Sequence, residues 1–206
     1  MTFTARTAGL AGIAGSLIGM VGAGTLHLMD PRVAGEYVSA PLTAGPFRLT
    51  ELLWTLSHVL VLVAALGFVR GGFSGTSRGV RLAGWAALTG FALQVGAEFA
   101  FVFFAESKES DTGPVVLSTV FGVSSILIAL GLIGLGIGTM KARRWDGWRR
   151  YAPLAWGIWS IAFIPLTFGD LFFIGIVSWL AVGLALWVAM LSQPATVPAS
   201  PAVQAA

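Results

Sequence analysis

The sequence has no cysteine and few charged residues. The missing cysteines exclude disulfides, thiolate nucleophiles and iron–sulfur ligation. Charged residues are 10% of the chain, whereas a soluble domain has about 25%. Hydrophobic residues are 56% and the mean hydropathy is +0.86. This composition is not that of a soluble domain, and it predicts an all-α, multi-pass membrane protein.

Six apolar stretches each have about the 20 residues that a helix needs to cross the hydrocarbon core. They predict one six-helix transmembrane domain over 1–192, followed by a disordered tail over 193–206. Pro41, Gly45 and Pro46 predict an irregular loop over 30–50. The predicted spans are roughly 8–29, 51–70, 82–105, 115–140, 152–169 and 171–191.

The basic residues predict the orientation. With a cytoplasmic N-terminus, nine of the 12 Lys and Arg residues lie on the cytoplasmic side, and Asp146 is the one acidic residue there. This distribution follows the positive-inside rule and predicts a cell-membrane protein with both termini cytoplasmic. The basic segment 141–150 is interpreted as a lipid-headgroup anchor, with Trp145 and Trp148 at the interface, and not as a nucleic-acid site.

The first span has a stripe of glycines at helical spacing, Gly12, Gly15, Gly19 and Gly22. Such stripes let helices approach closely, so this face predicts a helix contact, either within the chain or in a homo-oligomer. An alternative reading of this segment is a cleaved signal peptide, with Arg6 ahead of the apolar run.

Glu98 and His58 are the strongest candidates for chemistry. Each lies seven residues from the predicted outer end of its span, about 10 Å deep. Their spans are consecutive and antiparallel, so the two side chains can meet. A carboxyl group beside an imidazole is a proton-handling unit, and Glu98 and His58 are therefore the predicted catalytic pair. The structural alternative is a polar clamp between helices.

Other polar and aromatic residues are predicted to surround this pair in the outer half of the bundle. Glu51, Trp54, Thr55 and His58 share one helical stripe, and Glu51 is alternatively explained as part of a helix cap with Thr50. The predicted ligand-binding residues are Glu51, Trp54, Thr55, Gln94, Trp159 and Asp170. Further aromatic walls are expected from Phe91, Phe101 and Trp156.

These residues predict a pocket that binds or acts on a small hydrophobic or lipid-like molecule by acid–base chemistry. The alternatives are a small proton-coupled transporter and an accessory or regulatory membrane subunit without catalysis. A haem-b protein with His27 and His58 as axial ligands is a further alternative. The sequence has no metal-ligand cluster, so no metal or cofactor is predicted. The expected partners are the bilayer and a hydrophobic small molecule.

Overall fold

The computed structural model describes residues 4–28, 33–167 and 171–192. These residues form helices and loops and no strand, apart from a single bridge between Tyr37 and Lys108. Five of the α-helices are long and apolar enough to cross a membrane. The α-helices are α1 (Ala5–Leu28), α2 (Ala44–Arg70), α3 (Arg78–Phe101), α4 (Thr112–Ala142), α5 (Ala152–Ala162) and α6 (Phe172–Leu191). Three 3₁₀-helices follow α3, α4 and α5, namely η1 (Val102–Phe104), η2 (Gly147–Tyr151) and η3 (Ile164–Thr167).

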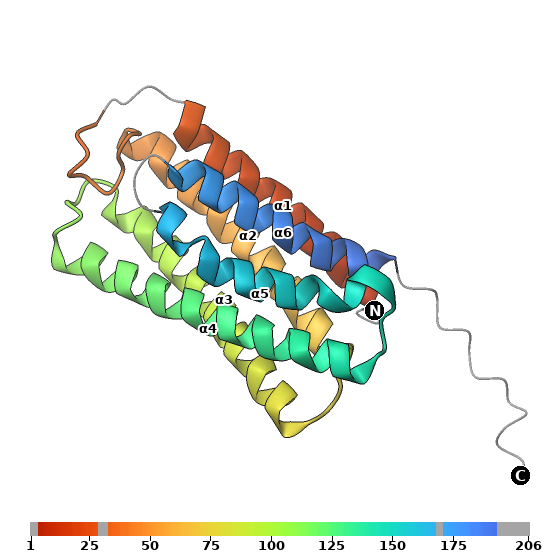
Figure 1. Ribbon diagram of the computed structural model, residues 1–206. Coiled ribbons are helices and arrows are strands. Elements are labelled where there is room, and N and C mark those ends of the chain that lie inside the picture. The colour runs from red at the N-terminus through yellow and green to blue at the C-terminus, as the bar shows by residue number, and fades with distance from the viewer. Residues whose placement is uncertain (1–3, 29–32, 168–170, 193–206) are drawn as a thin grey trace, which may run out of the picture.

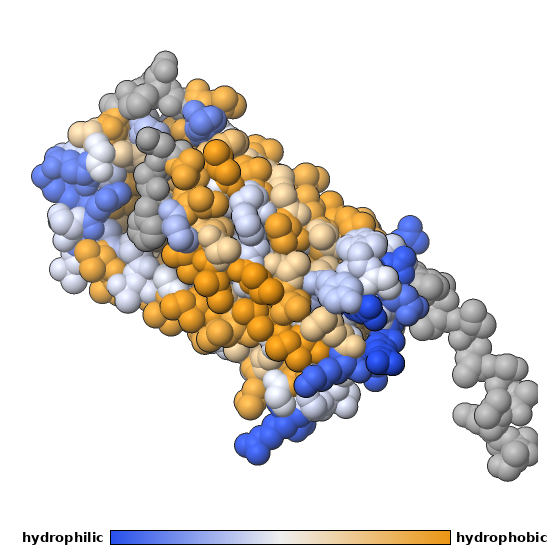
Figure 2. Space-filling model, in the orientation of Figure 1, coloured by the Kyte–Doolittle hydropathy of each residue, from blue (hydrophilic) through white to orange (hydrophobic). Residues whose placement is uncertain are grey.

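The helices run side by side as one elongated bundle (Figure 1). One end, called the basic end, holds the 71–77 and 143–151 connections with Arg70, Lys141 and Arg144. The opposite end, called the acidic end, holds the 33–43 and 102–111 connections with Glu36 and Glu106. Hydrophobic side chains cover the face between the two ends (Figure 2). This distribution is what a membrane-spanning bundle requires, because lipid tails contact the middle and water the ends.

The predicted span 152–169 is not a continuous α-helix. Helix α5 has only 11 residues and is followed by η3. Pro165 has no N–H to donate to the carbonyl of Ile161, and its ring would clash with that carbonyl, so the α-helix ends before it. Pro165 therefore interrupts the α-helix, and the chain continues as the 3₁₀-helix η3. The prediction of six membrane-spanning helices is therefore not confirmed.

Helix α2 begins earlier than predicted, and the predicted irregular loop over 30–50 is wrong for its last residues. The N-cap is Thr43, which places Pro46 in the first turn, where a missing N–H costs no hydrogen bond. Glu51 is consequently eight residues beyond the cap, and only 4% of its surface is exposed. Glu51 and Thr50 do not cap this helix, so Glu51 needs another explanation.

The glycine stripe of α1 is packed inside this chain. A Cβ added at Gly12 would lie 2.3 Å from the Trp187 ring, and one at Gly15 would lie 2.8 Å from the Ser57 carbonyl oxygen. The predicted close helix contact is thus made with α6 and α2. A homo-oligomer remains a prediction, but this face of α1 is already occupied.

The core continues to the basic end of the bundle. Phe68, Leu135, Trp156 and Trp187 are almost fully buried there. The predicted interfacial position is wrong for Trp145, which is only 4% exposed and packs against Phe68, with ring centroids 5.6 Å apart. The indole also contacts the Phe73 ring, with centroids 4.9 Å apart, so it is enclosed by aromatic side chains of the basic end.

Candidate functional site

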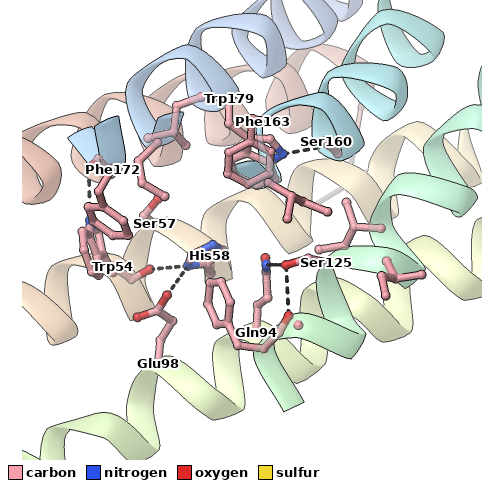
Figure 3. A pocket seen from close by; sticks show the side chains of 18 of the residues that line it. Trp54, Ser57, His58, Gln94, Glu98, Ser125, Ser160, Phe163, Phe172 and Trp179 are labelled. Atoms are coloured by element: carbon pink, nitrogen blue, oxygen red, sulfur yellow. Dashed lines mark hydrogen bonds and ion pairs between the residues drawn. The ribbon is translucent and has the colours of Figure 1, made fainter. Parts of the chain in front are cut away.

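A cavity of about 410 Å³ lies inside the bundle on the side of the acidic end. All six α-helices contribute to its wall. Gly19 of α1 brings that helix close, and Trp54 and His58 come from α2. Gln94 and Glu98 come from α3, one turn apart. Polar residues from several helices therefore meet at this cavity in the interior of the fold (Figure 3).

The hydrogen bonding of His58 determines which of its two nitrogens is free. Its Nδ1 lies 3.0 Å from the backbone carbonyl oxygen of Trp54, one turn earlier in α2. A carbonyl oxygen can only accept, so the hydrogen must be on Nδ1. In the neutral ring, Nε2 then carries a lone pair. Nε2 makes no hydrogen bond within the described part of the chain, and the side chain that bears it lines the cavity.

Glu98 lies directly behind this ring. Its Oε1 is 3.8 Å from His58 Nδ1, a distance at which charges interact but too long for a hydrogen bond. The carboxyl group of Glu51 lies beside that of Glu98, and both residues are 4% exposed. Two neighbouring carboxyl groups in such a site are best accommodated when one of them holds a proton, because a protonated carboxyl group can donate to the other. The three ionisable side chains form one cluster next to the cavity.

Gln94 adds a polar group with a defined orientation. Ser125 donates its hydroxyl hydrogen to the Phe121 carbonyl oxygen at 2.9 Å, so toward Gln94 it can only accept. Gln94 Nε2 fills that role at 3.3 Å. The amide oxygen Oε1 is left buried, without a partner in the described residues. An unpaired buried acceptor is costly, so the contacts within the chain do not fully satisfy Gln94.

Aromatic side chains close the remaining walls. The Trp179 indole donates to Ser160 Oγ at 2.8 Å, and the Trp54 indole donates to the Gly19 carbonyl oxygen at 3.2 Å. Their hydrogen bonds hold both rings in place, which leaves their apolar faces for the cavity. Phe121 and Phe163 complete this lining (Figure 3). The interior is thus mostly apolar, with a few polar groups at fixed positions, as is typical of ligand sites.

The structure brings together four of the predicted site residues in the cavity wall, Glu98, His58, Trp54 and Gln94. Glu51 lies behind Glu98. Thr55 does not reach the cavity, and its hydroxyl donates to the Glu51 carbonyl oxygen of its own helix. Trp159 instead joins α5 to α6 by donating to Ser178. Asp170 lies outside the described residues.

The predicted aromatic walls are partly wrong. Phe91 and Trp156 belong to the packed core below the cavity, and Phe101 packs with Leu42 and Phe47 at the acidic end. Their aromatic character was the only basis for this prediction, because Phe91 and Phe101 share a span with Glu98 whereas Trp156 lies in another span. Whether a residue faces the core or the cavity depends on the rotation of its helix about its own axis. That rotation is determined by the packing of all six helices.

Other wall residues were not predicted from the sequence as part of the site. Ser57, Ser125 and Ser160 line the cavity, as do Phe121 and Trp179. The serines gave only a weak signal, since serine is tolerated in membrane helices through bonds to its own backbone. Trp156, Ser160 and Phe163 follow one another at helical spacing, and this spacing is the signal that could have identified Ser160 and Phe163.

The chain matches no family model, and no curated protein or solved structure is significantly similar to it. No group of three or more His, Cys, Asp or Glu side chains suited to a metal occurs in the described residues. The fold and composition therefore define the class, which is an all-helical membrane-protein bundle with an internal, largely apolar cavity.

Proposed function

We propose that this protein binds a small lipid-like molecule in the cavity and acts on it by acid–base chemistry. The observation that carries the proposal is the orientation of His58, with Nδ1 held by the Trp54 carbonyl and Nε2 left free on a cavity-lining ring. In this proposal Nε2 accepts a hydrogen bond or a proton from a hydroxyl group of the ligand. Glu98, 3.8 Å from Nδ1, then stabilises the positive charge of the ring.

The cost of burying these groups supports a function over a purely structural role. Ionisable side chains inside a membrane are unfavourable by at least a few kcal/mol unless they are paired or hydrated. A structural clamp would satisfy its polar atoms, yet Glu51 Oε2 and Gln94 Oε1 have no partner in the described residues. Both atoms belong to side chains that are less than 5% exposed.

The alternatives receive less support. A transporter needs a path to both ends, but Phe91, Ile128 and Trp156 are packed below the cavity with at most 1% exposure. Haem ligation needs His27 and His58 on one iron. His27 instead stacks on Phe173 with a centroid distance of 4.3 Å, and it does not line the cavity.

The orientation in the membrane is part of the proposal. The basic end would face the cytoplasm, which would place both termini there and the cavity in the outer half of the bilayer. The chain would act in the cell membrane. Helix α1 would be retained and not cleaved, since Gly19 forms part of the cavity wall and Gly12 packs on Trp187.

Glu98→Gln tests the proposed function. The wild-type protein, purified from its host membrane in mild detergent, is expected to carry a stoichiometric additional mass in its native mass spectrum. The Glu98→Gln and His58→Ala variants should each lose most of that mass while remaining folded. Each of them lacks one of the two ionisable side chains that line the cavity. Thr55→Ala is the matched control. The Thr55 hydroxyl lies in α2, the helix of His58, but it bonds only to the Glu51 carbonyl. An additional mass that all three variants retain would contradict the proposal.

A further inference from the structure

The wall of the cavity has an opening along α4. Ser118, Gly122 and Ile126 line the cavity and are also exposed on the outside of the bundle. They follow one another at intervals of four residues, so they form one continuous stripe of the helix. Counted from Thr112, the stripe begins about 9 Å and ends about 21 Å along α4. Helix α4 has 31 residues and exceeds the hydrocarbon thickness, so most of this stripe faces lipid chains.

The early end of α5 explains why the opening exists. Helices α4 and α5 are antiparallel, and a Cβ added at Gly157 would lie 2.6 Å from the backbone nitrogen of Ile133. Ala162, the last residue of α5, is five residues further on and therefore reaches α4 at about the level of Ile128. Beyond that point α4 has no α-helical neighbour on this side. Ile164 and Phe172 form the opposite lip of the opening.

The polar side chains that line the cavity indicate which kind of ligand head group it can hold. His58 Nε2 is an acceptor without a hydrogen-bond partner in the described residues, so it favours a head group that donates a hydrogen bond. Glu98 stands nearby, and no Lys or Arg lines the described cavity, which disfavours a phosphate or carboxylate. A neutral hydroxyl group satisfies these conditions.

We infer that the ligand is a single-chain, neutral lipid alcohol that enters sideways from the bilayer between α4 and the side chains of Ile164 and Phe172. Its hydroxyl group donates a hydrogen bond to His58 Nε2, and its chain passes out beside Gly122. This inference rests on the proposed function and adds to it the ligand class and the route of entry.

The test compares two alcohols that share a head group. 1-Hexanol is short enough to lie within the cavity, whereas 1-hexadecanol must extend through the opening. A Cβ added at Gly122 meets nothing within 4 Å, so Gly122→Leu would fold normally and project into the opening. Gly122→Leu is expected to lower the affinity for 1-hexadecanol at least tenfold and to change that for 1-hexanol less than twofold. Both affinities are measured by native mass spectrometry of the detergent-solubilised protein.

Gly96→Leu is the matched control, because a Cβ at Gly96 also meets open space but lies on α3, away from the cavity wall. It should leave both affinities unchanged. Ser118→Leu is a second variant at the opening and should act like Gly122→Leu. Undiminished binding of 1-hexadecanol by both opening variants would overturn the route of entry and leave the proposed function standing. A wild-type protein that binds neither alcohol would overturn the ligand class, and the Glu98→Gln experiment would then decide the proposed function separately.

Discussion

Replacing His58 by phenylalanine is expected to weaken the binding of 1-hexanol about tenfold without unfolding the protein. The phenyl ring keeps the aromatic contacts of the imidazole with Phe121 and Trp179, whose ring centroids lie 6.5 and 6.3 Å away. It loses the Nε2 acceptor that the ligand hydroxyl would use. One such hydrogen bond contributes about 1.4 kcal/mol, which corresponds to a tenfold change in affinity. Titration followed by native mass spectrometry measures the effect.

The second histidine provides the control. His27→Phe makes the same substitution on a ring that stacks on Phe173 outside the cavity wall. It should leave the affinity for 1-hexanol within twofold of the wild-type value. Equal affinities for the wild type and both variants would show that His58 does not contact the ligand.

Gly131→Ala is expected to lower the free energy of unfolding by about 1–3 kcal/mol, which is the usual cost of overpacking a tight contact. A Cβ at this position would lie 2.5 Å from the backbone nitrogen of Ala87 and 2.7 Å from the carbonyl oxygen of Ala83. Both are backbone atoms of α3, so the clash is relieved only by moving α3 and α4 apart. The unfolding midpoint in detergent should fall by several degrees.

Gly122→Ala, on the same helix, is the matched control for that prediction. Its Cβ would meet nothing within 4 Å, and alanine favours an α-helix over glycine by about 1 kcal/mol. Its unfolding midpoint should be equal to or slightly above that of the wild type. A Gly131→Ala protein as stable as this control would contradict the described packing of α3 on α4.

The long apolar stretches predicted five of the helices well, because hydrophobic length is the dominant signal in a membrane protein. The prediction from the sequence was wrong where a local feature of the backbone determined the end of a helix. Pro46 lies inside α2 because the first turn does not need its N–H. Pro165 ends α5 even though the apolar run continues beyond it. That break cannot be read from hydropathy, yet it creates the opening of the cavity.

The proximity of Glu98 and His58 was predictable and is confirmed at 3.8 Å. Antiparallel neighbours with polar residues at equal depth bring them together, and depth follows from counting residues. The partners of Gln94 and Trp179 are Ser125 and Ser160, which lie on the neighbouring helices α4 and α5. They were not predictable, because the rotation of each helix decides which of its polar residues faces a given side chain. Their positions follow from how all six helices pack. The roles of these residues in binding or catalysis remain predictions.

The ¹⁵N NMR spectrum of the protein labelled at histidine tests the central claim most directly. The chain has two histidines, so a His27→Phe sample leaves the signals of His58 alone. The account predicts a protonated Nδ1 and an unprotonated Nε2, and only the Nε2 signal should shift markedly when 1-hexanol is added. A ring protonated at Nε2 instead, or an Nε2 signal that the alcohol does not change, would contradict the proposal that His58 presents a free nitrogen to a ligand in the cavity.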